Sequence, residues 1–393
     1  MGKKKRKKEA TEGPGPEPQA VPAPAGAWNA RDFFLALAIT LLVGAIGVAV
    51  VKAHLSVPAP AAAPVPAPDK AAPDKAAELE PSTAPLKSFQ VVNAHEHLFS
   101  RKYLNKYLAA CQRTGVAKTL FVASSEFTLK GKGADQAKGN EENTEELLAA
   151  ANEHPDAIIP FCTIYPGDPQ KLEKIKEFVA RGAKGLKLYN GHGNFHSSPM
   201  DTEDMMPVYA YCAETGLPIC WHVNYPNYKE EFIRILEKFP QLRAIVPHFG
   251  VTFFRPGSTD WNEFEQLFDR YPNLYTDTSF GTREILVSGL ETVSRRPDIF
   301  KAFIRKHSDR VLFGTDMVIT GNKEKTEDWI AAINTVCREV LEKDAYCFPL
   351  AAKGAKYATK DPDNERGVFR GLGLDDETLR KIYETNIQGV FAH

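Results

Sequence analysis

The chain has 393 residues, a formal net charge of -1 and 43% hydrophobic residues, enough for one large domain or two small ones. The balanced charge gives no indication of a nucleic-acid partner, because such proteins usually carry a clear excess of basic residues. The basic residues are unevenly placed, since residues 3–8 are all Lys or Arg.

An apolar run without charges follows this basic segment. Residues 33–51 (FFLALAITLLVGAIGVAVV) have about the length that a helix needs to cross the hydrocarbon core of a membrane. The basic residues before it predict that the tail, residues 1–32, stays in the cytosol. We therefore expect a single-pass signal anchor that places the rest of the chain outside the cytoplasm, in the periplasm or the extracellular space. A cleaved signal peptide is the alternative.

Residues 52–85 are rich in Pro and Ala, a composition that predicts a disordered, extended linker without a core of its own. The folded catalytic domain is then expected over residues 86–393. Six cysteines without a CxxC pair argue against a cysteine zinc site. Cys337 and Cys347 are candidates for a disulfide, which an extracytoplasmic location permits.

From residue 90 onward, short apolar runs alternate with segments of helical periodicity. Runs of this kind are typical of parallel strands that are covered on both faces. Eight strand–helix units in about 300 residues predict an α/β fold, a (β/α)8 or TIM barrel. A doubly wound open sheet is the alternative, but the Gly-rich turn it usually carries is missing. The predicted strands are residues 90–95, 118–124, 157–163, 184–189, 217–223, 243–249, 273–279 and 310–316.

Polar side chains lie at the C-terminal ends of several of these strands, which is where the active site of such a barrel forms. Side chains alternate along a strand, so the two histidines of the first strand share a face. Imidazole and carboxylate groups are typical ligands of a catalytic divalent metal ion. We therefore predict a metal site from His95, His97, His222, His248 and Asp316, with Lys187 near the end of the fourth strand pointing to the same mouth.

Six short motifs in chain order, NAHEHL, GAKGLKLY, CWHV, VPHFG, NLYTDTS and VLFGTDM, resemble those of the amidohydrolase superfamily. The resemblance covers about residues 89–391 and is greatest to the amidohydrolase-2 branch, which holds metal-dependent hydrolases and nonoxidative decarboxylases. It implies one divalent ion, with zinc expected. The ligands implied are His95, His97, His222 and Asp316.

Two further residues have open roles under this resemblance. His248 would bind a second metal ion or act as an acid–base and substrate-polarising group. Lys187 would bridge two metal ions after carboxylation, accompany a single ion, or pair as a buried cation with a carboxylate such as Asp316. A site with one ion is favoured and a site with two is the alternative.

The reaction implied is hydrolysis of a small molecule, in which a metal-activated water attacks an amide, ester or lactone carbonyl. Asp316 would serve as the catalytic base and then acid, and His248 would polarise the carbonyl. A nonoxidative decarboxylase on the same site is the alternative. A noncatalytic, membrane-anchored binding protein is the least favoured hypothesis.

Loop residues after strands four to seven are candidates for substrate binding: His192, His196, Tyr225, Arg255 and Arg283. Glu96 alternates away from its two flanking histidines, so we expect it to contact the helix side. Residues 343–373 exceed what the last connection of a barrel needs. We expect this insertion over the site or at the interface of a homo-oligomer.

Overall fold

The computed structural model describes residues 79–131 and 133–392. The basic tail, the helix predicted over residues 33–51 and most of the Pro/Ala-rich linker lie outside these described residues. Within the described part of the chain, no helix has both the length and the apolar character needed to cross a membrane.

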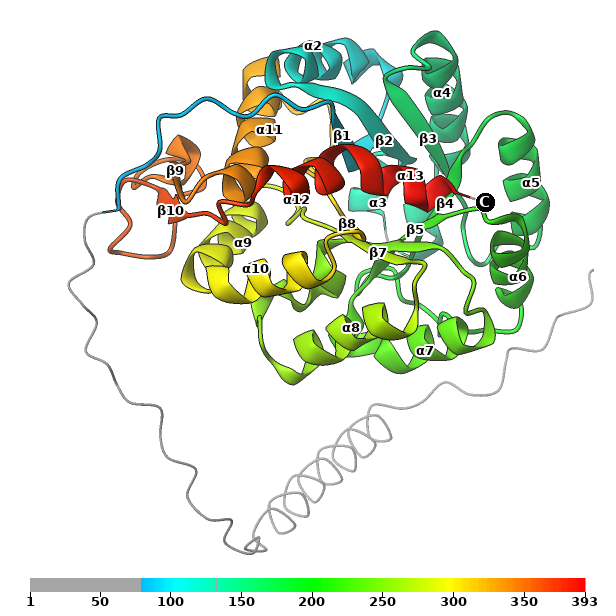
Figure 1. The fold of residues 1–393 in the computed structure, drawn as a ribbon. Helices are drawn as coiled ribbons and strands as arrows, with labels where there is room; N and C mark the ends of the chain where they lie inside the picture. The colour runs from blue at the N-terminus through cyan, green and yellow to red at the C-terminus, as the bar shows by residue number, and fades with distance from the viewer. Residues whose placement is uncertain (1–78, 132, 393) are drawn as a thin grey trace, which may run out of the picture. The chain divides into compact units, whose positions relative to one another are not determined.

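Eight parallel strands follow one another in sequence order around a barrel, as the alternation of apolar runs predicts (Figure 1). Backbone hydrogen bonds close the seam between the last strand and the first. The amide of Ala94 donates to the carbonyl of Phe313 at 2.7 Å, and the amide of Ile319 donates to that of His97 at 2.7 Å. The strands are β1 (Val91–Leu98), β2 (Val116–Ala123), β3 (Ile158–Thr163), β4 (Gly185–Gly191), β5 (Ile219–Val223), β6 (Ala244–Val246), β7 (Leu274–Asp277) and β8 (Val311–Leu312).

Helices surround the strands on the outside of the barrel (Figure 1). Several begin or end where the sequence supplies a cap: Gly115 ends the first of them at φ 72°, and the side chain of Thr326 accepts from the amide of Trp329 at the start of α11. The α-helices are α2 (Leu104–Thr114), α3 (Phe127–Lys130), α4 (Asn140–Glu153), α5 (Lys171–Ala180), α6 (Met206–Thr215), α7 (Tyr225–Lys238), α8 (Thr259–Arg270), α9 (Glu284–Arg295), α10 (Pro297–Lys306), α11 (Glu327–Glu342), α12 (Asp376–Arg380) and α13 (Asn386–Phe391).

The apolar core has two layers, because side chains alternate between the two faces of each strand. The larger layer fills the space between the strands and the helices, and Trp221 packs there against Tyr209 and Phe232. The smaller layer fills the barrel itself. At one end it includes Ile387 and Val390 of α13, which crosses the barrel in Figure 1.

A β-bulge in β1 sets which of its side chains point into the barrel. The pairing of β1 with β2 shifts register between Asn93 and Glu96. Ala94 belongs to the interior layer, and the bulge brings the adjacent His95 inward as well. Alternation then resumes, so that His97 also faces inward. The shared face of the two histidines was predicted, but the bulge was not.

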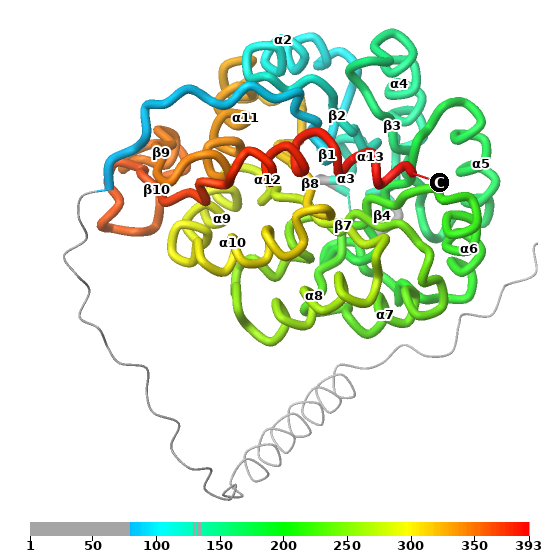
Figure 2. Tube along the Cα trace, in the orientation of Figure 1, coloured from blue at the N-terminus to red at the C-terminus, as the bar shows by residue number. Residues whose placement is uncertain are grey.

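The insertion lies beside the barrel (Figure 2). It contains an antiparallel hairpin of β9 (Ala345–Cys347) and β10 (Val368–Arg370). The first described residues run along it, and the amide of Ser82 donates to the carbonyl of Ala345 at 2.9 Å. Its contact with the mouth of the barrel is an ion pair of 2.6 Å between Lys356 and Glu324.

All six cysteines lie in the described part of the chain, and all six are free thiols. The disulfide considered between Cys337 and Cys347 is therefore wrong. Cys337 is buried within α11, whereas Sγ of the partly exposed Cys347 contacts the carbonyl of Arg366 at 3.5 Å.

Candidate metal centre

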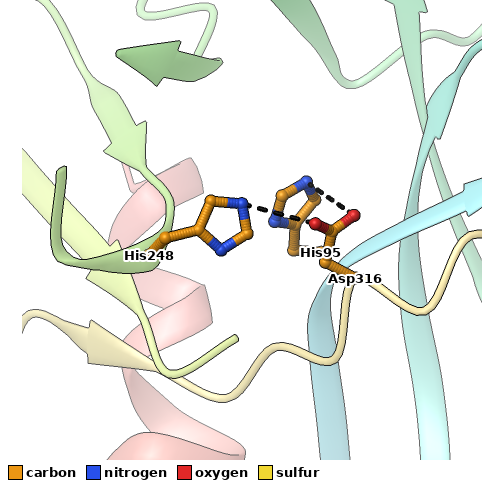
Figure 3. A group of neighbouring side chains, drawn as sticks. All are labelled: His95, His248 and Asp316. Atoms are coloured by element: carbon orange, nitrogen blue, oxygen red, sulfur yellow. Dashed lines mark ion pairs between the residues drawn. The ribbon is translucent and has the colours of Figure 1, made fainter. Parts of the chain in front are cut away.

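Side chains from three strand ends meet at the mouth of the barrel. One possible ligand atom from each of His95, His248 and Asp316 lies within 4.8 Å of the other two (Figure 3). His97 adjoins this group, with its Nε2 atom 3.3 Å from Nε2 of His95 and 3.1 Å from Oδ1 of Asp316. These four residues, 221 positions apart at most, form what we call the strand-end cluster.

Each imidazole of the cluster is anchored through its Nδ1 atom. Nδ1 of His95 lies 3.0 Å from Oδ2 of Asp277, and Nδ1 of His97 lies 2.9 Å from Oγ of Ser124. Nδ1 of His248 lies 3.1 Å from the carbonyl oxygen of Ser279. All three Nε2 atoms are thereby left to face the Asp316 carboxylate. Anchoring of this kind fixes the orientation and tautomer of metal-binding histidines.

The sequence analysis did not predict a role for Asp277, although this residue lies in the motif NLYTDTS. The signal was available: a carboxylate in the otherwise buried run NLYTDTS needs a partner inside the fold. Its Oδ1 atom accepts from the amides of His248 and Ser279 at 3.1 and 3.0 Å. Burial alone would raise the pKa of Asp277, but the hydrogen bond and charge of His95 lower it below its usual range.

The protonation states favoured by this environment suit cation binding. Burial lowers the pKa of His97 to about 4 and also lowers the pKa of His248. Burial would raise the pKa of Asp316, but its interactions with the surrounding imidazoles, that of His95 first, lower it well below its usual range. Neutral imidazoles beside an ionised carboxylate are the forms that bind a divalent metal ion.

The cluster also contains polar atoms that its own members do not satisfy. Oδ1 of Asp316 is buried and has no hydrogen-bond partner among the described residues, although Nε2 of His97 lies 3.1 Å from it. The two Nε2 atoms of His95 and His97 face each other at 3.3 Å. A cation between these lone pairs and the carboxylate would satisfy them all, so the residues present fit a divalent metal ion.

Lys187 extends from β4 into the barrel and is fully buried. Its Nζ atom lies 3.3 Å from Nε2 of His95, 3.6 Å from Sγ of Cys220 and 4.9 Å from the centre of the Tyr189 ring. It makes no ion pair with Asp316 in the part of the chain that the structure describes. The pairing considered for it as a buried cation is therefore wrong, and its contact is with a histidine of the cluster.

His222 lies at the edge of the cluster. Its ring centre is 5.2 Å from that of His248, but its Nε2 atom faces Oδ1 of Asn224 at 3.1 Å. The ring of His192 packs against it at 4.2 Å. Burial lowers the pKa of both His192 and His222, the former to about 4. The structure thus places His222 next to the group, but its Nε2 atom does not join the other imidazoles.

The remaining predicted substrate-binding residues are dispersed. His196 is turned to α7, where it stacks on Tyr228 at 3.8 Å and pairs with Glu231 at 2.9 Å. Tyr225 is 1% exposed and packs against another ring of the helical layer. Arg255 is exposed and pairs with an aspartate of α8. These three side chains have no contact with the cluster.

Arg283, by contrast, lines a cavity of about 680 Å³. The walls of this cavity come from the loops that follow β1, β2, β7 and β8, and they include Lys102, Tyr103, Asn322 and Lys325. Two of these loops carry on from the strands that hold the cluster. The cavity is therefore placed to admit a small molecule beside the strand-end cluster. Most of the charged side chains that line the cavity are basic.

Glu96 faces away from the cluster, as its alternation with the two histidines predicted. Its carboxylate is fully buried and contacts the loop that carries Asp316. Burial raises the pKa of Glu96 to about 7, although the hydrogen bond from Thr315 opposes this increase.

The family model described as Amidohydrolase matches residues 51–391 of the chain. No curated protein sequence matches it. Among solved structures, it resembles an uncharacterized TIM-barrel protein from Bordetella bronchiseptica at 15% identity and a TM-score of 0.50, over 77% of this chain and 98% of that one. It also resembles 4-oxalomesaconate hydratase from Rhodopseudomonas palustris at 17% identity and a TM-score of 0.47, over 77% of this chain and 95% of that one. A third similar structure is 2,6-dihydroxybenzoate decarboxylase from Rhizobium, at 13% identity and a TM-score of 0.45, over 77% of this chain and 98% of that one. The first likeness agrees with the barrel fold, and none of the three bears on the reaction.

Proposed function

Since the chain belongs to the amidohydrolase family, we propose that it is a metal-dependent hydrolase of a small molecule. Its reaction adds water to an amide, ester or lactone carbonyl, with one divalent ion, zinc by expectation, as cofactor. The observation that carries this proposal is the common orientation of three imidazoles, each anchored at Nδ1 and each directing Nε2 at Asp316.

The residues that would hold the ion are His95, His97 and Asp316, with His248 within reach of the same point. His222 would join them if its side chain turned from Asn224. A bound divalent ion supplies Lewis acidity, which polarises a carbonyl and lowers the pKa of water toward neutrality. Lys187 adjoins the site and would serve a second ion only after carboxylation.

Asp316 and His248 divide the proton chemistry in this proposal. Asp316 is ionised, so its carboxylate takes a proton from the attacking water and passes it to the leaving group. Nδ1 of His248 donates to the carbonyl of Ser279, so its Nε2 atom carries a lone pair and acts as ligand or base. Polarisation of the substrate by His248 would require that it first be protonated.

The cavity beside the cluster is the proposed substrate site, and Arg283 is its candidate binding residue. The guanidinium is partly exposed and its nearest carboxylate, that of Glu324, lies 3.7 Å away. It therefore remains able to pair with an anionic group of a substrate. His192, on the opposite side of the cluster, is the second candidate.

The test uses full-length protein purified without chelators. Elemental analysis should find about one divalent ion per chain. Turnover should appear in a screen of amides, esters, lactones and aromatic acids, should cease after chelation and should return with the metal. Asp316→Asn should abolish turnover and leave the fold intact, whereas the matched control Asp375→Asn, a cap of α12, should retain both.

Product analysis distinguishes the alternatives. Release of carbon dioxide from an aromatic acid would replace the hydrolase with a nonoxidative decarboxylase on the same residues. Protein that contains no metal and turns over none of these compounds would contradict both reactions and favour a noncatalytic binding protein.

A further inference from the structure

The β8–α11 loop, residues 313–326, holds Asp316 in a conformation that its own residues do not favour. The φ angles are 46° at Asp316 and 56° at Val318, in the left-handed region that is costly for residues other than glycine and most of all for β-branched ones. Such a backbone persists only where surrounding contacts fix it. The contacts of this loop are therefore part of how Asp316 reaches the cluster.

One set of contacts comes from Glu96, which lies between the two histidines of β1 but on the opposite face. Its Oε2 atom accepts from Oγ1 of Thr315 at 2.7 Å and from the amide of Met317 at 3.2 Å. Its Oε1 atom accepts from the amides of Val318 and His97, both at 2.8 Å. The three backbone amides can only donate, so both oxygens of Glu96 act as acceptors at these contacts.

A second set comes from Lys325, which is 4% exposed. Its Nζ atom donates to the carbonyl oxygens of Met317 and Val318 at 2.6 and 2.5 Å. The two residues after Asp316 thus have their amides bound to the buried carboxyl group of Glu96 and their carbonyls bound to the buried amino group of Lys325. Buried backbone N–H and C=O groups without hydrogen bonds would destabilise the fold. Glu96 satisfies the N–H groups of Met317 and Val318, and Lys325 satisfies their C=O groups.

We propose that Glu96 and Lys325 form a clamp that fixes the β8–α11 loop and thereby aims the carboxylate of Asp316 at the strand-end cluster. They are positioning residues, because neither touches the nitrogen atoms of the cluster. The link to cation binding rests on the proposed function, whereas the hold on the loop does not. Partners that orient metal ligands typically contribute about 10- to 100-fold to metal affinity.

If Glu96 and Lys325 only stabilised the fold, replacing either one would lower the free energy of unfolding without a specific effect on the position of Asp316. The chain offers a matched control for this alternative. Lys106 donates to the carbonyls of Thr320 and Lys325 at 2.9 and 2.8 Å, so it anchors the same loop by the same chemistry, farther from Asp316. Lys106→Met therefore removes an anchor of the loop but leaves the clamp in place.

The first experiment needs no metal. Amide hydrogen exchange is measured in full-length wild type, Glu96→Gln, Lys325→Met and Lys106→Met. In Glu96→Gln, either orientation of the amide sets an NH2 group against a backbone N–H, because each oxygen of Glu96 accepts from a backbone amide. Exchange at Met317 and Val318 should be at least about tenfold faster in the two clamp variants than in wild type. In Lys106→Met it should be unchanged.

The second experiment measures Co²⁺ affinity by competition with a chromophoric chelator, together with the visible absorption of the bound Co²⁺. The two clamp variants should bind about 10- to 100-fold more weakly, with an altered spectrum. In a protein that already carries Asp316→Asn, adding Glu96→Gln should not lower the Co²⁺ affinity further, because the clamp acts through Asp316. Lys106→Met should match wild type in affinity and spectrum.

The outcomes separate the two proposals. Unchanged exchange at Met317 and Val318 in both clamp variants would overturn the clamp, as would equal losses of affinity from Glu96→Gln with and without Asp316. Wild-type protein that binds no Co²⁺ would overturn the proposed metal function and the link to it. The exchange data would then still decide whether Glu96 and Lys325 hold the loop.

Discussion

Replacement of Asp277 by asparagine should weaken metal binding without removing any ligand. Oδ1 of Asp277 accepts from two backbone amides and from Oγ of Ser279, so the oxygen of an asparagine must stay at that position. Its NH2 group then faces Nδ1 of His95, 3.0 Å away, where the carboxylate had accepted a proton. Two donors cannot share this contact, so His95 must move its proton to Nε2.

The size of the effect follows from what His95 loses. With its proton on Nε2, the imidazole has no lone pair to direct at Asp316 and the cation. Loss of such a supporting partner typically lowers metal affinity about 10- to 100-fold, or about 1.4 to 2.7 kcal/mol. The free energy of unfolding should change less, because the asparagine keeps the shape and three of the four hydrogen bonds of Asp277.

Two measurements check this reasoning. Competition titration with Zn²⁺ and a chromophoric chelator gives the affinity, and the nitrogen chemical shifts of labelled histidine report which ring nitrogen of His95 carries the proton. Asp375→Asn is the matched control, because asparagine caps a helix as well as aspartate does. An affinity within twofold of wild type, with the His95 proton still on Nδ1, would refute the argument.

Four further predictions concern other parts of the chain. Burial raises the pKa of the Cys162 thiol to about 12 from its usual value near 9, so the unfolded chain releases this proton first. Between pH 9 and 12 this thiol alone should lower the free energy of unfolding by about 1.4 kcal/mol per pH unit, so urea titrations should show a shallower fall in Cys162→Ala. With thiol reagents at pH 8, the native protein should react at Cys347, the one cysteine that is not buried among the described residues, and at all six cysteines when unfolded. His196→Ala should lower the melting temperature by loss of its contacts with Tyr228 and Glu231 but leave metal content unchanged. Residues 33–51 should carry the full-length protein into the membrane fraction, and deletion of residues 1–78 should release it; the full-length protein in the soluble fraction would contradict this.

The sequence was sufficient for the order of the strands, because each buried parallel strand is a continuous apolar run bounded by turn residues. It was insufficient for where β6 and β8 end. The runs predicted strands over residues 243–249 and 310–316, yet the structure has Ala244–Val246 and Val311–Leu312. The chain leaves the strand conformation early, so that His248 and Asp316 occupy positive φ angles. Local propensity therefore fails where the candidate site needs a strained turn.

Site residues divide in the same way. A histidine or aspartate at a strand end is local information, so the four members of the strand-end cluster were predicted. Partners that come from distant elements were not: Asp277 supports His95 from 182 positions away. His196 follows β4 as expected of a residue at the mouth, but Glu231 of α7 draws it aside. Which of several nearby charges a polar side chain meets depends on helix packing, which periodicity does not specify.

The distribution of backbone strain suggests how the two halves of the site differ. Among the described residues, every non-glycine residue with positive φ lies in the loops after β6, β7 and β8. Such conformations cost about 1 to 3 kcal/mol each. The contacts of Asp277 help to hold His248, and those of Glu96 and Lys325 help to hold Val318. The half that carries His95, His97 and Lys187 sits instead on two of the longest strands, β1 with its bulge and β4, and none of these three residues has a positive φ. A cation joining the two halves would be held by a fixed pair of imidazoles on one side and, on the other, by a carboxylate whose position depends on buried charges behind it.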